Sequence, residues 1–236
     1  MKKINFDKVF SFILVSLLGL FIMKVLYSVA GEEAARFTAD HYISYGVDET
    51  GAINIITAIL FDYRAFDTLG EATVIFTAAS VVALLLPRHE ASMLKTEFTP
   101  VVQQSIAFIL PFLWIISIFL ISYGHLSPGG GFSGGVIISA MSILIIFTYG
   151  YRYMTRRFNV KKLSLIEDIG ALAFLTIGLA GIIAGGTFLA NSQVGIYPGT
   201  PGELLSGGLM PLSNFAVAAK VGTGLSVIFL SLARED

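Results

Sequence analysis

Charged side chains are rare in this chain, and four of them stand close together just before a long apolar run: Asp62, Arg64, Asp67 and Glu71. If this segment is helical, the last three share one face with Thr68, because residues three and four apart are neighbours on a helix. A carboxylate beside water can bind Na⁺ or pass protons, since its pKa changes readily with burial and neighbouring charge. The segment therefore indicates either a cation or proton pathway, or an interfacial salt bridge from Arg64 to Asp67 or Glu71 that fixes the loop.

Lys220 is the second polar position, because it lies well inside the last apolar run of the chain. A lysine at the centre of a membrane helix costs roughly 2.5–3.5 kcal/mol on insertion scales. Such a lysine either relays protons or is the fixed partner of an acidic group on a neighbouring helix, and both readings stay open. Glu167 and Asp168, by contrast, are expected to begin the fifth apolar run at the membrane interface, where the helix dipole suffices to stabilise carboxylates.

A glycine-rich segment follows the third apolar run and begins with Gly124 and His125. Its other notable members are Pro128, Gly129, Gly130, Gly131, Gly134 and Gly135. The segment lacks the Lys-Ser/Thr ending of a phosphate-binding P-loop, so it indicates a tight turn between closely packed helices instead. His125 can relay protons near neutral pH, or it can be structural.

Composition excludes most other classes of protein. The 236 residues are 55% hydrophobic and 13% charged, with a mean hydropathy of +0.81, which predicts an integral membrane protein. There is no cysteine, so the chain provides no thiolate for zinc or an iron–sulfur cluster. The net charge of −1 gives no indication of nucleic-acid binding. We expect no cofactor and no resident metal ion.

Six apolar runs are long enough to cross a bilayer, and they lack the alternation of a β-barrel. We expect an all-α membrane fold with spans at about 9–30, 69–86, 103–123, 131–150, 167–189 and 211–232. Residues 31–50 are interpreted as a polar loop. Residues 51–60 are interpreted as a short re-entrant or interfacial helix, because they are too few to cross.

Basic residues predict the orientation of these spans. Lys and Arg are concentrated before the first span, after the second, between the fourth and fifth, and after the sixth. Six spans with both termini in the cytoplasm agree with the positive-inside rule. The N-terminus also resembles a signal peptide, with Lys2 and Lys3 before an apolar stretch. An uncleaved first helix is favoured, because five later spans already require membrane insertion.

We expect two modules joined by a linker, because the chain has no internal repeat and its polar join contains several charges. Residues 1–90 hold two spans, residues 91–99 form a cytoplasmic linker, and residues 100–236 hold four spans.

Two of these segments resemble a known family. The pattern from Gly124 to Gly135 is similar to the signature of the MnhB/MrpB subunits of the multisubunit Mrp-type Na⁺/H⁺ antiporter, and the resemblance covers residues 100–236. The stretch Asn54–Glu71, which ends Phe-Asp-Thr-Leu-Gly-Glu, resembles the C-terminal end of the large MrpA protein of the same complex. In membrane-bound hydrogenases and sulfane reductases, a similar segment is a separate small protein (MbhE-like).

The resemblance implies a non-catalytic, multi-pass subunit of a plasma-membrane complex that exchanges Na⁺ for H⁺. Its partners would be other membrane subunits, and Glu71 would take the place of a glutamate that matters for antiport. Two alternatives stay open: the same module in a redox-driven hydrogenase or sulfane reductase complex, and a structural scaffold whose charges only hold subunits together.

Overall fold

The computed structural model describes residues 6–29, 36–85 and 98–233, and it divides the chain into two compact units, 1–40 and 41–236. The first unit contains helix α1, Phe6–Val29, whose segment Phe10–Ser28 has a mean hydropathy of 2.2. None of that segment is buried inside the chain. A helix that is apolar on all sides is suited to an environment of lipid or of other membrane helices.

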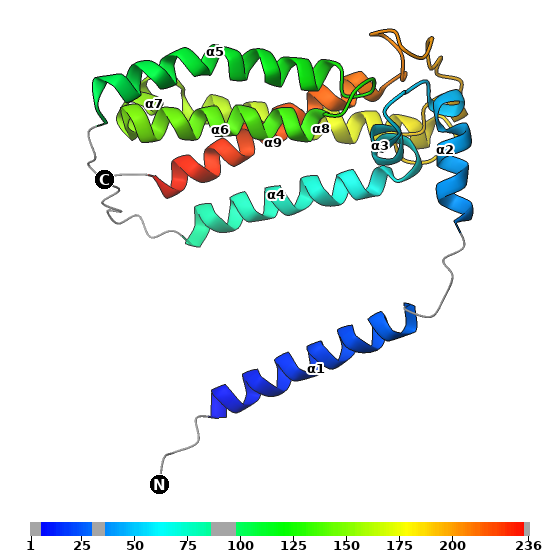
Figure 1. Cartoon of the computed structure of the whole chain (residues 1–236), viewed down its shortest axis with the longest axis horizontal. Coiled ribbons are helices and arrows are strands. Elements are labelled where there is room, and N and C mark those ends of the chain that lie inside the picture. The colour runs from blue at the N-terminus through cyan, green and yellow to red at the C-terminus, as the bar shows by residue number, and fades with distance from the viewer. Residues whose placement is uncertain (1–5, 30–35, 86–97, 234–236) are drawn as a thin grey trace. The chain divides into compact units, whose positions relative to one another are not determined.

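The second unit is a bundle of spanning helices with short elements at both ends (Figure 1). Its elements are α2 (Phe37–Thr50, which begins in the first unit), α3 (Ile55–Ala58), the π-helix η1 (Ile59–Tyr63), α4 (Ala65–Leu85), α5 (Pro100–Ser122), α6 (Gly131–Tyr149), α7 (Tyr151–Arg157), α8 (Val160–Ile183), the 3₁₀-helix η2 (Ser192–Val194) and α9 (Met210–Leu232).

The all-α membrane fold is confirmed. The described part of the chain contains no strand and six helices that are long and apolar enough to cross a membrane. These spans are Phe10–Ser28, Ala65–Val82, Pro100–Ser122, Gly131–Tyr149, Val160–Ile183 and Met210–Leu232. Which end of the bundle faces the cytoplasm stays a prediction.

Several boundaries differ from the sequence-based expectation. Residues 37–50 form helix α2 rather than a polar loop. In place of one helix at 51–60, the chain forms α3 followed by the π-helix η1. Helix α3 begins only at Ile55, because the Asn54 side chain caps it by accepting hydrogen bonds from the backbone N–H groups of Ile56 and Thr57. The fifth span ends at Ile183 rather than near Leu189, since the chain turns back and lays the Phe188 ring against Gly178.

Helix α9 lies at the centre of the bundle and packs against α4, α5, α6 and α8. The close approach depends on small residues. A β-carbon on Gly135 of α6 would lie 2.9 Å from the Val221 side chain, and one on Gly170 of α8 would lie 2.8 Å from the Ala216 carbonyl oxygen. Where the helices touch, the Ser226 hydroxyl donates to the Ser142 hydroxyl at 2.9 Å.

The glycine-rich turn is attached to the start of α9 by Asn214. The Asn214 side-chain oxygen accepts from the Gly131 backbone N–H at 2.8 Å. A β-carbon on Gly131 would lie 2.2 Å from the Asn214 carbonyl oxygen, and Gly130 has a φ of 119° that disfavours larger residues. Pro128 and Gly129 are exposed at the tip, while Gly134 packs on Ile121.

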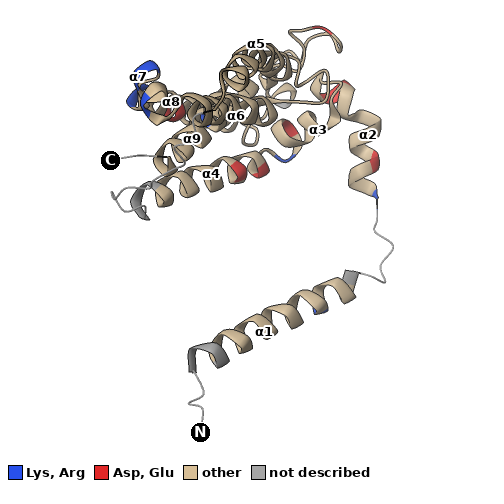
Figure 2. Ribbon diagram, turned by 60° about the vertical axis from the view of Figure 1, so that its left-hand side comes forward, with Lys and Arg blue, Asp and Glu red and all other residues tan. Residues whose placement is uncertain are grey.

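Opposite charges mark the two ends of the bundle (Figure 2). Basic residues gather on α7 and the first turn of α8: Arg152, Arg156, Arg157, Lys161 and Lys162. Acidic residues lie at the other end, on α2, η1 and the start of α4. The chain is therefore polarised along the direction in which its helices run.

We predict that Gly131→Ala lowers stability by about 1–3 kcal/mol, because the added methyl group overlaps the α9 backbone. Thermal unfolding of the full chain in lipid nanodiscs measures this effect. Gly19→Ala is the control, since nothing lies within 4 Å of a β-carbon at that helical position. An unchanged midpoint for Gly131→Ala would show that the turn is not tightly packed.

Candidate functional site

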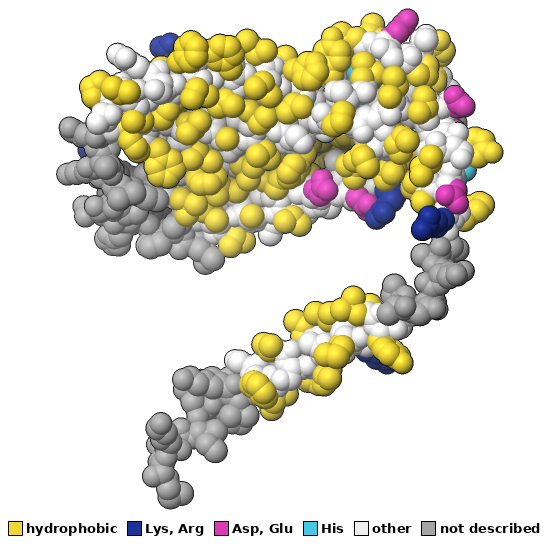
Figure 3. Space-filling model, in the orientation of Figure 1, with side chains coloured by type: hydrophobic (Ala, Val, Ile, Leu, Met, Phe, Trp, Pro, Cys, Tyr) yellow, Lys and Arg dark blue, Asp and Glu magenta, His cyan; other side chains and the backbone are white. Residues whose placement is uncertain are grey.

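The carboxylates at the start of α4 lie on the outside of the bundle. Arg64 Nη2 is 2.7 Å from Asp67 Oδ2, and both side chains are exposed. Glu71, one turn further along the spanning helix, is also exposed. Figure 3 shows acidic and basic side chains near this end of an otherwise apolar surface. Arg64 and Asp67 therefore form the salt bridge that the sequence offered as one interpretation. Glu71 has no ion pair among the described residues.

The expected common face of this segment is only partly correct. Arg64 lies outside the helix with a φ of −129°, at the C-terminal cap of η1. Thr68 is buried and donates its hydroxyl to the Leu60 carbonyl at 2.7 Å. Asp67 and Glu71 alone remain on the exposed face, because η1 interrupts the helix ahead of α4.

Lys220 and Glu167 face each other inside the membrane bundle. Lys220 Nζ lies 4.0 Å from Glu167 Oε1, and at least nine-tenths of each side chain is buried. Neither atom has a hydrogen-bond partner within the described ranges. The Phe76 ring of α4 lies 5.6 Å from the same ammonium, close enough for a cation–π contact. A lysine, a glutamate and an aromatic ring from three spanning helices thus form one buried polar site.

The expectation that Glu167 begins the fifth span is wrong. Helix α8 begins at Val160, so Glu167 lies in its third turn rather than its first. Space for the carboxylate exists because residue 224 is glycine: a β-carbon there would lie 2.7 Å from Glu167 Oε1. The sequence signal was available, since an acid and a lysine in two different apolar runs are natural partners.

His125 lies in the turn after α5 and is fully buried. Burial lowers the pKa of the imidazole, an effect partly offset by the backbone carbonyls of Glu203 and Leu204. Its own carbonyl accepts from the Asn54 backbone N–H at 3.0 Å. A neutral, enclosed imidazole between three loops favours the structural reading of this residue.

Asp62 lies apart from the other predicted residues, in a cavity of about 370 Å³ between α2, η1 and η2. The cavity is lined by His41, Glu49, Thr50, Asp62, Tyr63 and Ser192. Burial, and secondly the charge of Glu49, raise the pKa of Asp62 to about 7. Sequence reasoning missed His41 and Glu49, because residues 31–50 were interpreted as a loop.

The predicted residues therefore occupy separate places rather than one site. Arg64 pairs with Asp67, Glu71 stands exposed on α4, Lys220 meets Glu167, and Asp62 and His125 belong to the loop end. In the described part of the chain, no group of three or more His, Asp or Glu side chains is placed to hold a metal ion.

Two family models match the chain. One, described as a domain related to the MnhB subunit of Na⁺/H⁺ antiporter, matches residues 101–227. The other is the MbhE family of MBH subunits, and it matches residues 8–104. An uncharacterized protein of Methanocaldococcus jannaschii is 31% identical over 90% of this chain and 87% of its own length. A probable K⁺/H⁺ antiporter protein of the combined A/B type, from Rhizobium meliloti, is 26% identical over 72% of this chain, which spans only 20% of that relative.

Two solved structures share the fold. The membrane-bound sulfane sulfur reductase, an archaeal respiratory membrane complex, contains a chain with a TM-score of 0.75 and 29% identity, matched over 98% of this chain and 100% of the other. The Mrp complex from Dietzia sp. contains a chain with a TM-score of 0.73, matched over 100% of this chain and 27% of the other. At 20% identity, the second likeness concerns the fold alone.

The buried pair gives a stability prediction. Lys220→Met leaves the Glu167 carboxylate without its counter-charge, and breaking a buried pair costs about 3–5 kcal/mol. We expect Glu167→Gln with Lys220→Met to recover much of that loss in thermal unfolding. Glu203→Gln, which changes an exposed loop carboxylate, is the control. Equal midpoints for Lys220→Met and the control would contradict the pairing.

The raised pKa of Asp62 predicts a pH dependence of stability. Between about pH 4 and pH 7 the folded chain binds a proton that the unfolded chain releases, so stability falls as pH rises through this window. Asp62→Asn should abolish this pH dependence. Asp48→Asn, which changes an exposed carboxylate next to Glu49 on α2, should retain the pH dependence. Unfolding midpoints measured from pH 5 to pH 8 test both, and parallel curves for wild type and Asp62→Asn would refute the assignment.

Proposed function

The chain belongs to the family of domains related to the MnhB subunit of Na⁺/H⁺ antiporters, and it is a multi-pass membrane subunit of an Mrp-related complex. From this premise we propose that it contributes to cation/proton exchange. In this proposal the chain is non-catalytic. It lines part of an ion pathway, packs against other membrane subunits, and Na⁺ and H⁺ are the ions exchanged across the plasma membrane.

Glu71 is the observation that carries the proposal. It stands exposed on α4, within the spanning segment Ala65–Val82, which has the lowest mean hydropathy of the six spans at 1.3. An ionisable group facing lipid is costly, so it requires a polar partner or a water-filled path. The described residues of the second unit leave this side of α4 uncovered, and in our proposal another subunit supplies the polar surrounding.

The Lys220–Glu167 pair is a second polar position, and Phe76 of α4 relates it to Glu71. The Phe76 ring, which contacts the Lys220 ammonium, belongs to a residue five positions after Glu71 on α4. Five residues correspond to about 7.5 Å along the helix axis. An amine and a carboxylate that face each other without hydrogen bonds can exchange a proton as charges nearby change. We therefore assign Glu71 and Asp67 to the ion path and Lys220 to its proton side.

The printed names of the relatives support this assignment. The A/B-type K⁺/H⁺ antiporter protein matches most of the chain, and the Na⁺/H⁺ antiporter B protein of Bacillus subtilis is 28% identical over 33% of it. We further propose that residues 1–90 and 100–236 are two modules fused through 91–99, most of which lies outside the described residues. Matches of separate families to 8–104 and 101–227 support this division.

A redox-linked complex is the second candidate, favoured by the full-length match to the chain of the sulfane sulfur reductase. The proteins that co-purify with the chain decide between the two. Iron–sulfur or nickel–iron proteins favour the respiratory complex, and their absence favours a free-standing antiporter.

We predict that Glu71→Gln, introduced into the whole complex, reduces ΔpH-driven Na⁺ exchange in membrane vesicles at least about tenfold, since ~1.4 kcal/mol added to a barrier slows a step tenfold. Glu71→Asp should restore part of the rate, because it keeps the charge.

Glu203→Gln, which changes an exposed loop carboxylate, is the matched control and should leave exchange unchanged. Native gels report assembly in parallel. Normal exchange by an assembled Glu71→Gln complex would eliminate the ion-path role. Loss of assembly with all charge-neutral variants would favour a scaffold instead.

A further inference from the structure

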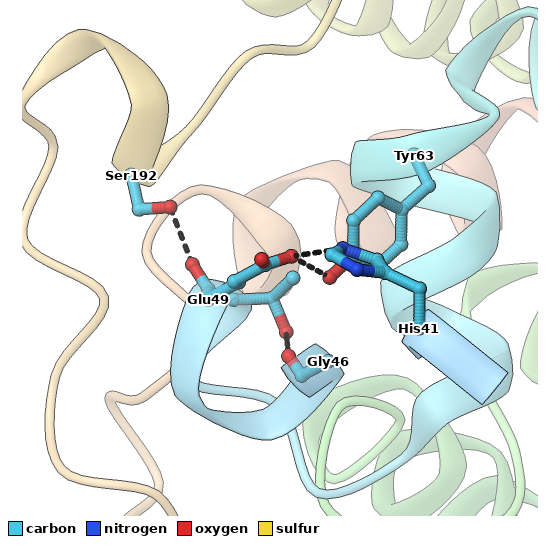
Figure 4. A network of polar contacts seen from close by, with 6 residues as sticks. His41, Gly46, Glu49, Tyr63 and Ser192 are labelled. Atoms are coloured by element: carbon cyan, nitrogen blue, oxygen red, sulfur yellow. Dashed lines mark hydrogen bonds and ion pairs between the residues drawn. The ribbon is translucent and has the colours of Figure 1, made fainter. Parts of the chain in front are cut away.

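The cavity between α2, η1 and η2 has polar walls that the proposed function does not use. Its volume of about 370 Å³ leaves room for several water molecules. Figure 4 shows the polar network around it, in which Glu49 contacts His41, Tyr63 and Ser192. The lining comes from three elements that are far apart in the sequence: α2, η1 and η2.

The hydroxyl groups of this cavity have their protons engaged. The Tyr63 hydroxyl donates to Glu49 Oε2, and the Ser192 hydroxyl donates to the Glu49 backbone carbonyl. The Thr50 hydroxyl donates to the Gly46 carbonyl at 2.7 Å. Because each proton is engaged, the unused lone pairs of these oxygens can only accept a hydrogen bond or bind a cation. The lining therefore suits a cation better than an anion.

The charged groups around Asp62 reinforce this preference. From α2, Glu49 and His41 face the cavity, with His41 Nε2 3.2 Å from Glu49 Oε2. Tyr63 comes from η1 itself, and burial, then Glu49, raise its pKa, so it stays neutral. At the start of α4, Arg64 is occupied by Asp67. When Asp62 ionises, the described residues place two carboxylates and one imidazole at the cavity, with Asp62 buried and with Glu49 and His41 open to its mouth.

We propose that this cavity binds one hydrated monovalent cation, which enters as Asp62 releases its proton. A monovalent ion fits because two carboxylates and a few hydroxyls are fewer ligands than Ca²⁺ requires, and one imidazole is too few for a transition metal. The site goes beyond the proposed function, since binding requires neither transport nor Glu71. It lies at the end of the bundle where η1 leads into α4.

Binding of ²²Na⁺ to the full chain in nanodiscs of zwitterionic lipid tests the proposal, with ionic strength held constant by choline chloride. We expect saturable binding near pH 8.5 that is about tenfold or more weaker near pH 5.5, because the proton competes for Asp62. Asp62→Asn and Glu49→Gln should each abolish most of it. Asp48→Asn, on the same helix but outside the cavity, should bind as wild type does.

Glu71→Gln separates this inference from the proposed function, because it should leave ²²Na⁺ binding at the cavity unchanged. Absence of saturable binding, or binding equal at both pH values, would overturn the proposal. So would binding that survives Asp62→Asn but disappears with Glu71→Gln. If Asp62→Asn does not elute as a folded chain in gel filtration, Glu49→Gln and the wild-type pH profile decide.

Discussion

Close packing around α9 is the constraint on which the rest of this structure depends. Glycine and alanine let the backbones of α6 and α8 approach α9 so closely that a β-carbon at Gly131 or Gly170 would collide with it. The same absence of bulk at Gly224 makes room for the Glu167 carboxylate beside Lys220. Packing and polar chemistry are therefore not separate properties of α9, because small residues create both the contact and the space.

Polar groups in this chain follow a clear division. The charged groups that are buried among the described residues either face an opposite charge, as Glu167 and Lys220 do, or lie in a cavity with polar walls, as Asp62 does. Glu71 on α4 and Asp168 on α8 are the predicted carboxylates of the spans that are exposed without an ion pair among the described residues. An exposed carboxylate on a spanning helix requires a polar or aqueous surrounding beyond the residues of the bundle that pack against it.

The π-helix η1 links the loop end of the bundle to the membrane. It places Asp62 inward against α2, and the chain then emerges at Arg64, where α4 begins with Asp67 and Glu71 on its outer face. Neighbouring acidic residues thus point in different directions. Asp62 precedes Asp67 by five residues and Glu71 by nine, about 140° and 180° around a regular helix, so their spacing already favours different faces. The π-helix η1 adds an irregular backbone between them, which ends at Arg64.

The sequence by itself determined the all-α fold, the six spans and the family, because the cost of placing a segment in lipid is a sum over adjacent residues and the Gly124–Gly135 motif is contiguous. Only the tertiary structure decided that Lys220 meets Glu167 and that Asp62 shares a cavity with Glu49 and His41. Those contacts join elements far apart in the chain. Their geometry depends on how α8 and α9 are rotated about their axes and on where α2 folds, which no local pattern of residues specifies.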